Sequence, residues 1–226
     1  MTLLTELANK YISDKGSDQG HSHNFTEFYS KYFESIRFDV RNVLEIGVCD
    51  GASLKMWKDY FPNATIVGAD ILDKSEYCED RIHTIILDQS NLRHLDTAVE
   101  AFKNNDLEFD IIIDDGSHHM WDQQITLLKF LDVLKKDGLY VIEDLHTSLA
   151  VNGTPLYGRP VEIMPGGINT TLFMLEKKFE YSRYLTNSEL KTLQKSLEIL
   201  EINEIRNPRL PEWGGKQITS MLKRVC

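Results

Sequence analysis

Five short apolar runs alternate with helical stretches through the middle of the chain. The runs lie at 43–47, 65–70, 82–88, 109–115 and 138–144. They are rich in Val and Ile, and each ends in Gly or Asp. Near-continuous apolar strands are typical of a parallel sheet that is covered on both faces. Their alternation with helices predicts an α/β fold with a doubly wound, Rossmann-like and mostly parallel sheet.

The segments on either side of this region predict additions to the same sheet. Residues 3–11 and 25–36 carry apolar side chains at helical spacing and predict two N-terminal helices. Alternating runs at 197–202 and 217–222 predict late antiparallel strands that close a seven-stranded sheet. Residues 152–169 contain three prolines and predict a loop of the lid or substrate type.

The length and composition favour one globular domain. The chain has 226 residues, 42% of them hydrophobic and 27% charged. Single cores grow to roughly 250 residues, so we expect a single domain over 1–226. Its expected parts are an N-terminal helical cap or flap at 1–40, a ligand-binding core at 41–146, and a substrate loop with closing strands at 147–226.

The net charge of −10, from 35 acidic and 25 basic residues, argues against nucleic acid or an anionic membrane as a partner. The apolar stretches are far shorter than the roughly 20 residues needed to cross a bilayer, and residues 1–10 do not resemble a secretory signal. The three cysteines, Cys49, Cys78 and Cys226, form no C-x-x-C pair and fit a reducing compartment. We therefore expect a cytoplasmic protein.

The turn after the first run reads Glu45-Ile-Gly47-Val-Cys-Asp50-Gly51-Ala-Ser53, where doubly wound sheets bind their ligands. Gly47 and Gly51 allow a tight turn and a close backbone approach. Their G-x-x-x-G spacing differs from the G-x-G-x-x-G of pyrophosphate sites, and no P-loop lysine follows. Glu45 and Asp50 would repel a phosphate. The loop is therefore suited to a cationic ligand.

Carboxylates also end the next two runs. Asp70 is placed to accept both hydroxyls of a ribose, and Asp88 can neighbour an adenine. A ribose, an adenine and a positive charge together describe S-adenosylmethionine (SAM). Two alternatives stay open: Asp70 alone would equally suit a nicotinamide cofactor, and Asp88 or Ser90 would also suit the N-cap of the next helix.

The fourth and fifth runs end in paired acids. Neighbouring strands lie about 4.8 Å apart, so Asp115, Glu143 and Asp144 can share one hard cation, Mg²⁺ or Mn²⁺. Because side chains alternate along a strand, Glu143 and Asp144 can both bind it only if the strand has already ended. The alternative is that these acids cap helices or pair with Lys or Arg.

His118 follows the acids of the fourth run and is the candidate general base, ahead of His119 and His146. Methyl transfer to an alcohol releases the hydroxyl proton, which an imidazole can accept while a metal ion lowers the pKa of the alcohol. The alternative is a solvated loop histidine.

These residues resemble the class I SAM-dependent methyltransferases and, more narrowly, the metal-dependent sugar O-methyltransferases of the mycinamicin VI 2''-O-methyltransferase type. The resemblance covers about residues 10–146, and its most specific strings are Asp88-Gln89-Ser90 and 114–118. It implies that 1–226 is one methyltransferase domain with His118, assisted by Asp115, in catalysis. The metal ligands are then Asp115, Glu143 and Asp144. The expected cofactor-binding residues are Glu45, Gly47, Gly51, Ser53, Asp70, Asp88, Gln89 and Asp114, with Lys15 and His23 from a flap over SAM.

The predicted function is SAM-dependent, metal-assisted O-methylation of a sugar hydroxyl. The acceptor is a nucleotide-linked sugar, a polysaccharide precursor or a glycosylated natural product, and a homo-oligomer is left open. A diphosphate on the acceptor could bind one of four basic residues: Arg159, Arg206, Arg209 and Lys216. The competing readings are an NAD-dependent oxidoreductase and a non-catalytic nucleotide-binding subunit.

Overall fold

A computed structural model describes the backbone of residues 1–18, 23–149, 154–156, 159–161, 163–206 and 216–226. Seven strands form one sheet in the order β3-β2-β1-β4-β5-β9-β8. Its strands are β1 (Asn42–Ile46), β2 (Thr65–Asp70), β3 (Ile82–Ile86), β4 (Phe109–Asp114), β5 (Leu134–Ile142), β8 (Leu197–Arg206) and β9 (Lys216–Arg224). Strands β1 to β5 are parallel, and β9 runs antiparallel to both β5 and β8. The predicted fold class is confirmed.

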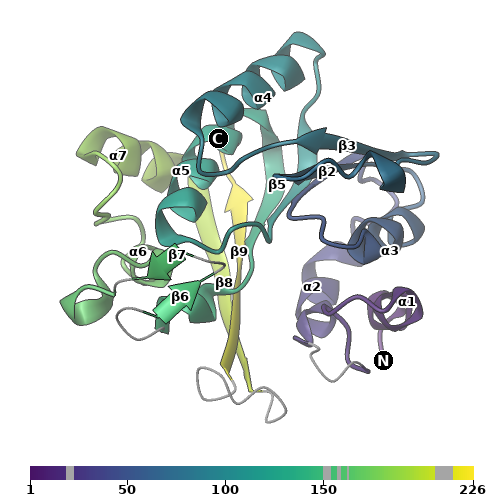
Figure 1. The fold of residues 1–226 in the computed structure, drawn as a ribbon, viewed down its shortest axis with the longest axis horizontal. Coiled ribbons are helices and arrows are strands. Elements are labelled where there is room, and N and C mark those ends of the chain that lie inside the picture. The colour runs from purple at the N-terminus through teal and green to yellow at the C-terminus, as the bar shows by residue number, and fades with distance from the viewer. Residues whose placement is uncertain (19–22, 150–153, 157–158, 162, 207–215) are drawn as a thin grey trace.

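Helices cover both faces of this sheet, as Figure 1 shows. Its helices are α1 (Leu3–Tyr11), α2 (Phe25–Phe33), α3 (Ala52–Tyr60), α4 (Leu92–Asn104), α5 (Met120–Phe130), α6 (Thr171–Glu176) and α7 (Asn187–Ser196). The first three pack on one face and the other four on the opposite face. Short 3₁₀ turns occur at Ser75–Tyr77, Leu131–Val133, Leu145–Leu149 and Pro165–Gly167.

Strand β4 shows why the apolar runs are nearly continuous. Ile111 and Ile113 belong to the core on the α1–α3 side, whereas Ile112 belongs to the core on the α4–α7 side. All three side chains are fully buried. Because successive side chains in a strand point to opposite faces, a sheet covered on both faces needs apolar residues at odd and even strand positions alike. The polar residues are thereby left to the strand ends.

Three element boundaries differ from the predicted ones. Strand β3 ends at Ile86, so Asp88 and Gln89 lie in a loop. Strand β5 begins at Leu134, which the helical spacing had placed in the preceding helix, and ends at Ile142. Its early end meets the condition under which Glu143 and Asp144 can face the same ligand. Within the predicted 152–169 loop, two short strands, β6 (Thr154–Leu156) and β7 (Arg159–Val161), form an antiparallel pair.

None of the described helices is long and apolar enough to cross a membrane.

Candidate active site

The loop between β1 and α3 is held close to its neighbours by two glycines and one carboxylate. Gly47 has φ +94°, and a side chain there would collide with the carbonyl of Asp115. Gly51 has φ +75° and lies against the ring of Tyr77. Asp70, at the end of β2, accepts the backbone N–H of Val48 at 2.9 Å. Only glycine fits the first position without strain, so the turn is shaped for a close backbone approach.

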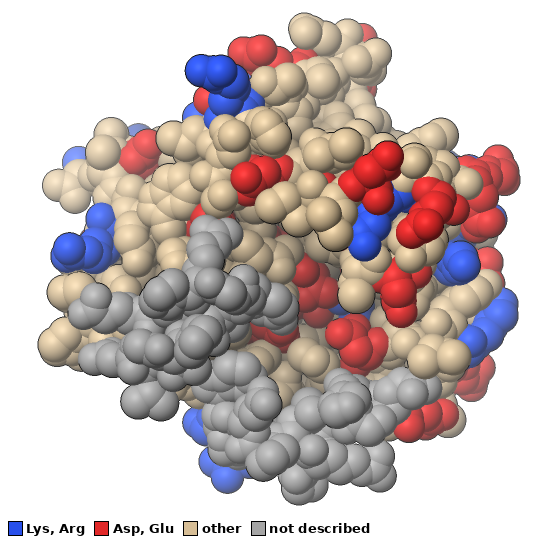
Figure 2. Space-filling view, viewed as in Figure 1, with Lys and Arg blue, Asp and Glu red and all other residues tan. Residues whose placement is uncertain are grey.

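Two adjoining pockets open along the carboxyl ends of the strands. Their volumes are about 290 Å³ and 350 Å³, and they share Gly47, Asp70 and Gly116. The predicted residues lining the smaller pocket are Gly47, Asp70, Asp88 and Gln89. Those lining the larger pocket are Lys15, His23, Gly47, Ser53, Asp70, Asp115, His118 and Asp144. On this face of the molecule, acidic side chains gather over the region of β2, β3 and α3 (Figure 2).

Asp115, His118 and Asp144 lie close together where they line the larger pocket. One ligand atom from each lies within 4.8 Å of the others. The Nε2 atom of His118 is 3.6 Å from Asp144 Oδ2 and 3.9 Å from Asp115 Oδ1. Carboxylate oxygens are the ligands that Mg²⁺ and Mn²⁺ prefer, and an imidazole nitrogen is also acceptable to Mn²⁺. The described residues therefore fit a divalent ion held by Asp115 and Asp144.

Glu143 faces a different partner. Both of its carboxylate oxygens lie 3.0 Å from the Nζ of Lys15, and it is not a member of the three-residue group. The same ammonium forms an ion pair with Asp115 and lies 3.6 Å from Glu45. Lys15 is 1% exposed, and the pull of these carboxylates, against burial, raises its pKa well above the ordinary value. Burial and the charge of Asp115 raise the pKa of Glu143.

Three histidines surround Asp144. His23 Nδ1 lies 3.1 Å from its carboxylate, while His118 and His146 lie 3.6 and 3.7 Å away. Although burial opposes it, the hydrogen bond and charge of Asp144 raise the pKa of His23 to about 9. Burial lowers the pKa of His146 to about 4, so this ring is neutral near pH 7. Burial would raise the pKa of Asp144, but His118 and His23 outweigh it and lower that pKa.

The loop carrying His118 is fixed by hydrogen bonds from its neighbours. The Oγ of Ser117 donates to Asp122 at 2.6 Å, and the Ser117 N–H donates to Gln89 at 2.9 Å. Thr147 Oγ1 donates to the carbonyl of His118 at 3.3 Å. His118 itself has φ 52°, an uncommon backbone conformation for a histidine, and is 5% exposed. These contacts fix the backbone around His118, whose Nε2 faces Asp115 and Asp144.

Gln89 also reaches a buried acid behind the loop. Its Nε2 donates to Asp114 at 2.7 Å, and Tyr140 donates to the other Asp114 oxygen at 3.4 Å. Burial raises the pKa of Asp114 to about 7. Asp114 therefore helps to position Gln89 and, through it, the backbone of Ser117.

This raised pKa predicts a pH-dependent stability. The folded state keeps a proton on Asp114 that the unfolded chain releases near pH 4, so the stability contributed by Asp114 falls between about pH 4 and pH 7. A shift of about 3 pKa units corresponds to roughly 4 kcal/mol. We expect a rise from pH 5 to pH 8 to lower the free energy of unfolding of the wild-type protein more than that of Asp114→Asn, in which this position does not titrate. The free energy is measured by urea unfolding at each pH. Parallel stability curves for the two proteins would contradict the assignment.

Several predicted residues lie behind the pockets. Glu45, Gly51, Asp114 and Glu143 are not among the described residues that line them. The fully buried Glu45 accepts from Ser53 Oγ at 2.6 Å, and burial raises its pKa to about 7. Asp88 accepts the Ser90 N–H at 2.9 Å, whereas the N-cap of α4 is Asn91. The direct cofactor contacts of these residues stay predictions.

Sequence reasoning missed three parts of the site. It gave no role to Asp122 or Thr147, which fix the His118 loop, and it did not foresee that Lys15 contacts Glu143. The spacing of Asp122 five residues after Ser117 was a usable signal, because α5 begins between them. Contacts across more than a hundred residues leave no comparable local signal.

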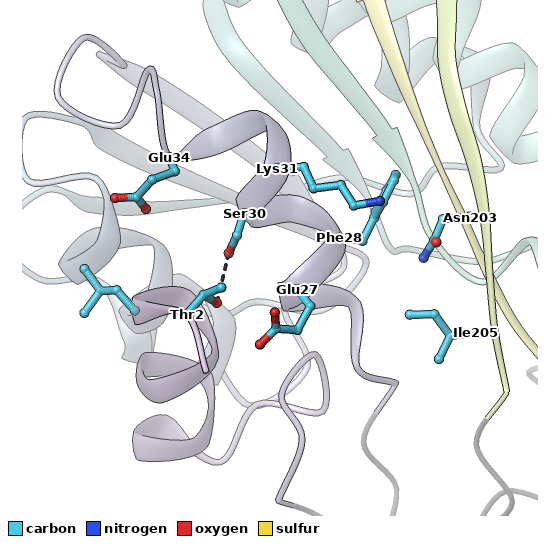
Figure 3. A pocket seen from close by; sticks show the side chains of 9 residues that line it. Thr2, Glu27, Phe28, Ser30, Lys31, Glu34, Asn203 and Ile205 are labelled. Carbon is cyan, nitrogen blue, oxygen red and sulfur yellow. Dashed lines mark hydrogen bonds between the residues drawn. The ribbon is translucent and has the colours of Figure 1, made fainter.

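A larger cavity of about 720 Å³ lies between the N-terminal helices and β8, and its described lining residues are all different from those of the two pockets. Figure 3 shows Glu27, Lys31 and Asn203 on its walls, with Ser30 donating to Thr2 at 3.0 Å. None of the predicted site residues lines it. We therefore place the candidate active site at the strand ends.

Residues 44–142 match the family model described as a methyltransferase domain. The chain is 39% identical over 152 residues to mycinamicin VI 2''-O-methyltransferase of Micromonospora griseorubida, covering 64% of this chain and 36% of that protein. It is also 39% identical over 140 residues to 8-demethyl-8-alpha-L-rhamnosyl tetracenomycin-C 2'-O-methyltransferase of Streptomyces olivaceus, covering 59% and 36%.

A solved structure gives the same picture. It is the MycE methyltransferase of the mycinamycin pathway in complex with Mg, S-adenosylhomocysteine (SAH) and mycinamycin VI. The structural match covers 99% of this chain and 54% of the MycE chain. The TM-score is 0.70 and the identity is 27%. The resemblance predicted from the sequence is confirmed. This chain spans little more than a third of the length of the two curated relatives, at 36% of each.

Proposed function

We propose that the protein is a SAM-dependent, divalent-metal-assisted O-methyltransferase that acts on a sugar hydroxyl. The observation that carries this proposal is the convergence of Asp115, His118 and Asp144 beside the pocket that runs from Gly47 to Asp70. The relatives whose names describe sugar O-methylation support it. We further propose that residues 1–226 work as a single domain, with 1–40 as its cap.

The two pockets divide the methyl donor between them. Asp70 and Asp88 line the smaller pocket, where a ribose and an adenine would lie. The larger pocket holds Lys15 and His23, which would face the methionine part of the donor. Asp70 already accepts backbone N–H groups from Val48 and Leu72, so its orientation toward the ribose is fixed before binding. Bound SAM would supply an electrophilic methyl group on a positively charged sulfur.

Asp115 and Asp144 would hold the metal ion, with Glu143 as a third ligand. An ion such as Mg²⁺ or Mn²⁺ would orient the acceptor hydroxyl and make it more acidic. His118 would accept the proton of that hydroxyl at Nε2 as the oxygen bonds to the methyl carbon. The bond from this carbon to the donor sulfur would break at the same time, and S-adenosylhomocysteine would leave with the electron pair. Asp115 and Asp144, less than 4 Å from Nε2, stabilise the imidazolium that results. Holding both reactants in line would remove much of the entropic barrier.

The acceptor that the observations favour is a glycosylated small molecule. Both curated relatives are named for such acceptors. Of the basic residues considered for a diphosphate, Arg206 and Lys216 pair with Glu204, at 3.7 and 3.0 Å. The side chain of Arg159 and all of Arg209 lie outside the described residues. A sugar nucleotide therefore has less support as the acceptor.

We propose a cytoplasmic location, which the free and exposed thiols of Cys49, Cys78 and Cys226 support. That the protein acts on small molecules, without nucleic-acid or membrane partners, stays a prediction from its charge. A homo-oligomer likewise stays open.

The donor assignment is tested by isothermal titration calorimetry with S-adenosylhomocysteine (SAH) and with NAD, each with and without EDTA. We expect SAH to bind both with and without EDTA, because the donor contacts lie mainly at Gly47 and Asp70. NAD should bind at least a hundredfold more weakly. Tight NAD binding without a response to SAH would favour the oxidoreductase reading instead.

A further inference from the structure

Lys15 lies at the meeting point of the donor and metal sites. Its ammonium contacts Asp115 and Glu143 and lies 3.6 Å from Glu45. The two glutamates are at most 2% exposed, so water does little to screen these charges. Two of the three partners, Asp115 and Glu143, are also the proposed ligands of the divalent ion.

His23, like Lys15, belongs to the connection between α1 and α2. Its Nδ1 lies 3.1 Å from Asp144, the third proposed metal ligand. Backbone hydrogen bonds join the two parts of this segment. The His23 N–H donates to the carbonyl of Asp14, and the Asn24 N–H donates to the carbonyl of Gly16 at 3.1 Å. Each proposed metal ligand therefore contacts a nitrogen from the connection between α1 and α2.

An ammonium and a divalent ion on the same two carboxylates would repel each other strongly in a buried site. Movement of the Lys15 side chain would relieve this repulsion, and the adjoining 350 Å³ pocket, which Lys15 lines, offers the space.

We propose that Lys15 competes with the divalent ion for Asp115 and Glu143 and thereby sets the metal affinity of the site. This inference rests on the proposed function, because it takes these carboxylates as metal ligands. Metal binding moves the ammonium from the carboxylates into the pocket proposed for the methionine part of the donor. There it faces the α-carboxylate of the donor, so the metal and the donor bind cooperatively.

The test is calorimetric titration of MgCl₂ into the wild-type protein, Lys15→Met and Lys10→Met. Lys10 is the matched control, because it lies nearby in the sequence but is exposed and pairs with Asp59. We expect Lys15→Met to bind Mg²⁺ at least tenfold more tightly than wild type, and Lys10→Met to bind within twofold. Equal or weaker binding by Lys15→Met would overturn the inference and leave the proposed function standing. No Mg²⁺ binding by any of the three proteins would overturn both.

A second measurement uses the wild-type protein, in case Lys15→Met does not fold. The buried and hydrogen-bonded ammonium of Lys15 should exchange slowly with water and give a ¹H–¹⁵N signal of its own. We expect saturation with MgCl₂ to shift or abolish this signal. A signal that is unchanged at saturating Mg²⁺ would show that Lys15 stays in place, contrary to the proposal.

Discussion

Replacing His118 with alanine is expected to slow methyl transfer about 10²- to 10⁴-fold, the usual contribution of a positioned general base. Its Nε2 lies within 4 Å of Asp115 and Asp144, where the acceptor hydroxyl would be held. The measurement is single-turnover transfer from SAM, followed by mass spectrometry for a product that is heavier by one methylene. Binding of SAH should change little, because His118 is not among the described residues that line the smaller pocket with Asp70 and Asp88.

His119 provides a matched control for this prediction. It is the next residue and another histidine, but it lies outside the group formed by Asp115, His118 and Asp144. We expect His119→Ala to keep the rate within about threefold. Titration of MgCl₂ into His118→Ala separates the two roles open to His118. If His118 is only a base, its removal leaves the Mg²⁺ affinity unchanged. If it is a metal ligand, its removal changes that affinity. A rate for His118→Ala close to wild type would refute its role as base.

Removing the metal ligands should have an effect of similar size. Asp115→Asn and Asp144→Asn each delete a charge from the proposed site, and the lost polarisation of the acceptor is worth several kcal/mol. We expect a decrease in rate of at least a hundredfold for each variant, measured at saturating SAM. Treatment of the wild-type protein with EDTA should give the same loss.

The controls separate metal loss from general damage. Added MgCl₂ should restore the EDTA-treated wild-type protein but neither variant. Asp132→Asn removes an exposed carboxylate that pairs with Lys103 and is not among the described residues that line the two pockets, and should leave the rate unchanged. Full activity in EDTA would mean that His118 and the donor contacts act without a metal ion.

The strand ends could be predicted because burial leaves a direct mark on the sequence. A sheet covered on both faces forces apolar residues into its strands, so Asp70, Asp115 and Asp144 stand out where the apolar runs stop. Parallel strands bring these ends to one edge, and the structure places all three along the larger pocket. The predicted closing strands are likewise found, as β8 and β9.

The partners of these acids could not be predicted in the same way. Lys15 and Glu143 are 128 residues apart, and their contact depends on how the connection between α1 and α2 folds over the sheet. The same is true of His23 and Asp144. An ion pair of this kind has no periodicity, so it becomes visible only in three dimensions. The alternative that the acids pair with a lysine is therefore partly confirmed, at Glu143 and Asp115.

The central claim is that the acids at this sheet edge receive a cationic methyl donor and a divalent ion side by side. The most direct test is a crystal grown with SAH and MnCl₂, with anomalous diffraction used to locate manganese. The account predicts an anomalous peak between Asp115 and Asp144, and density for SAH running from Asp70 past Gly47. The account is contradicted if, at saturating concentrations of both, manganese binds elsewhere or SAH is absent from these pockets.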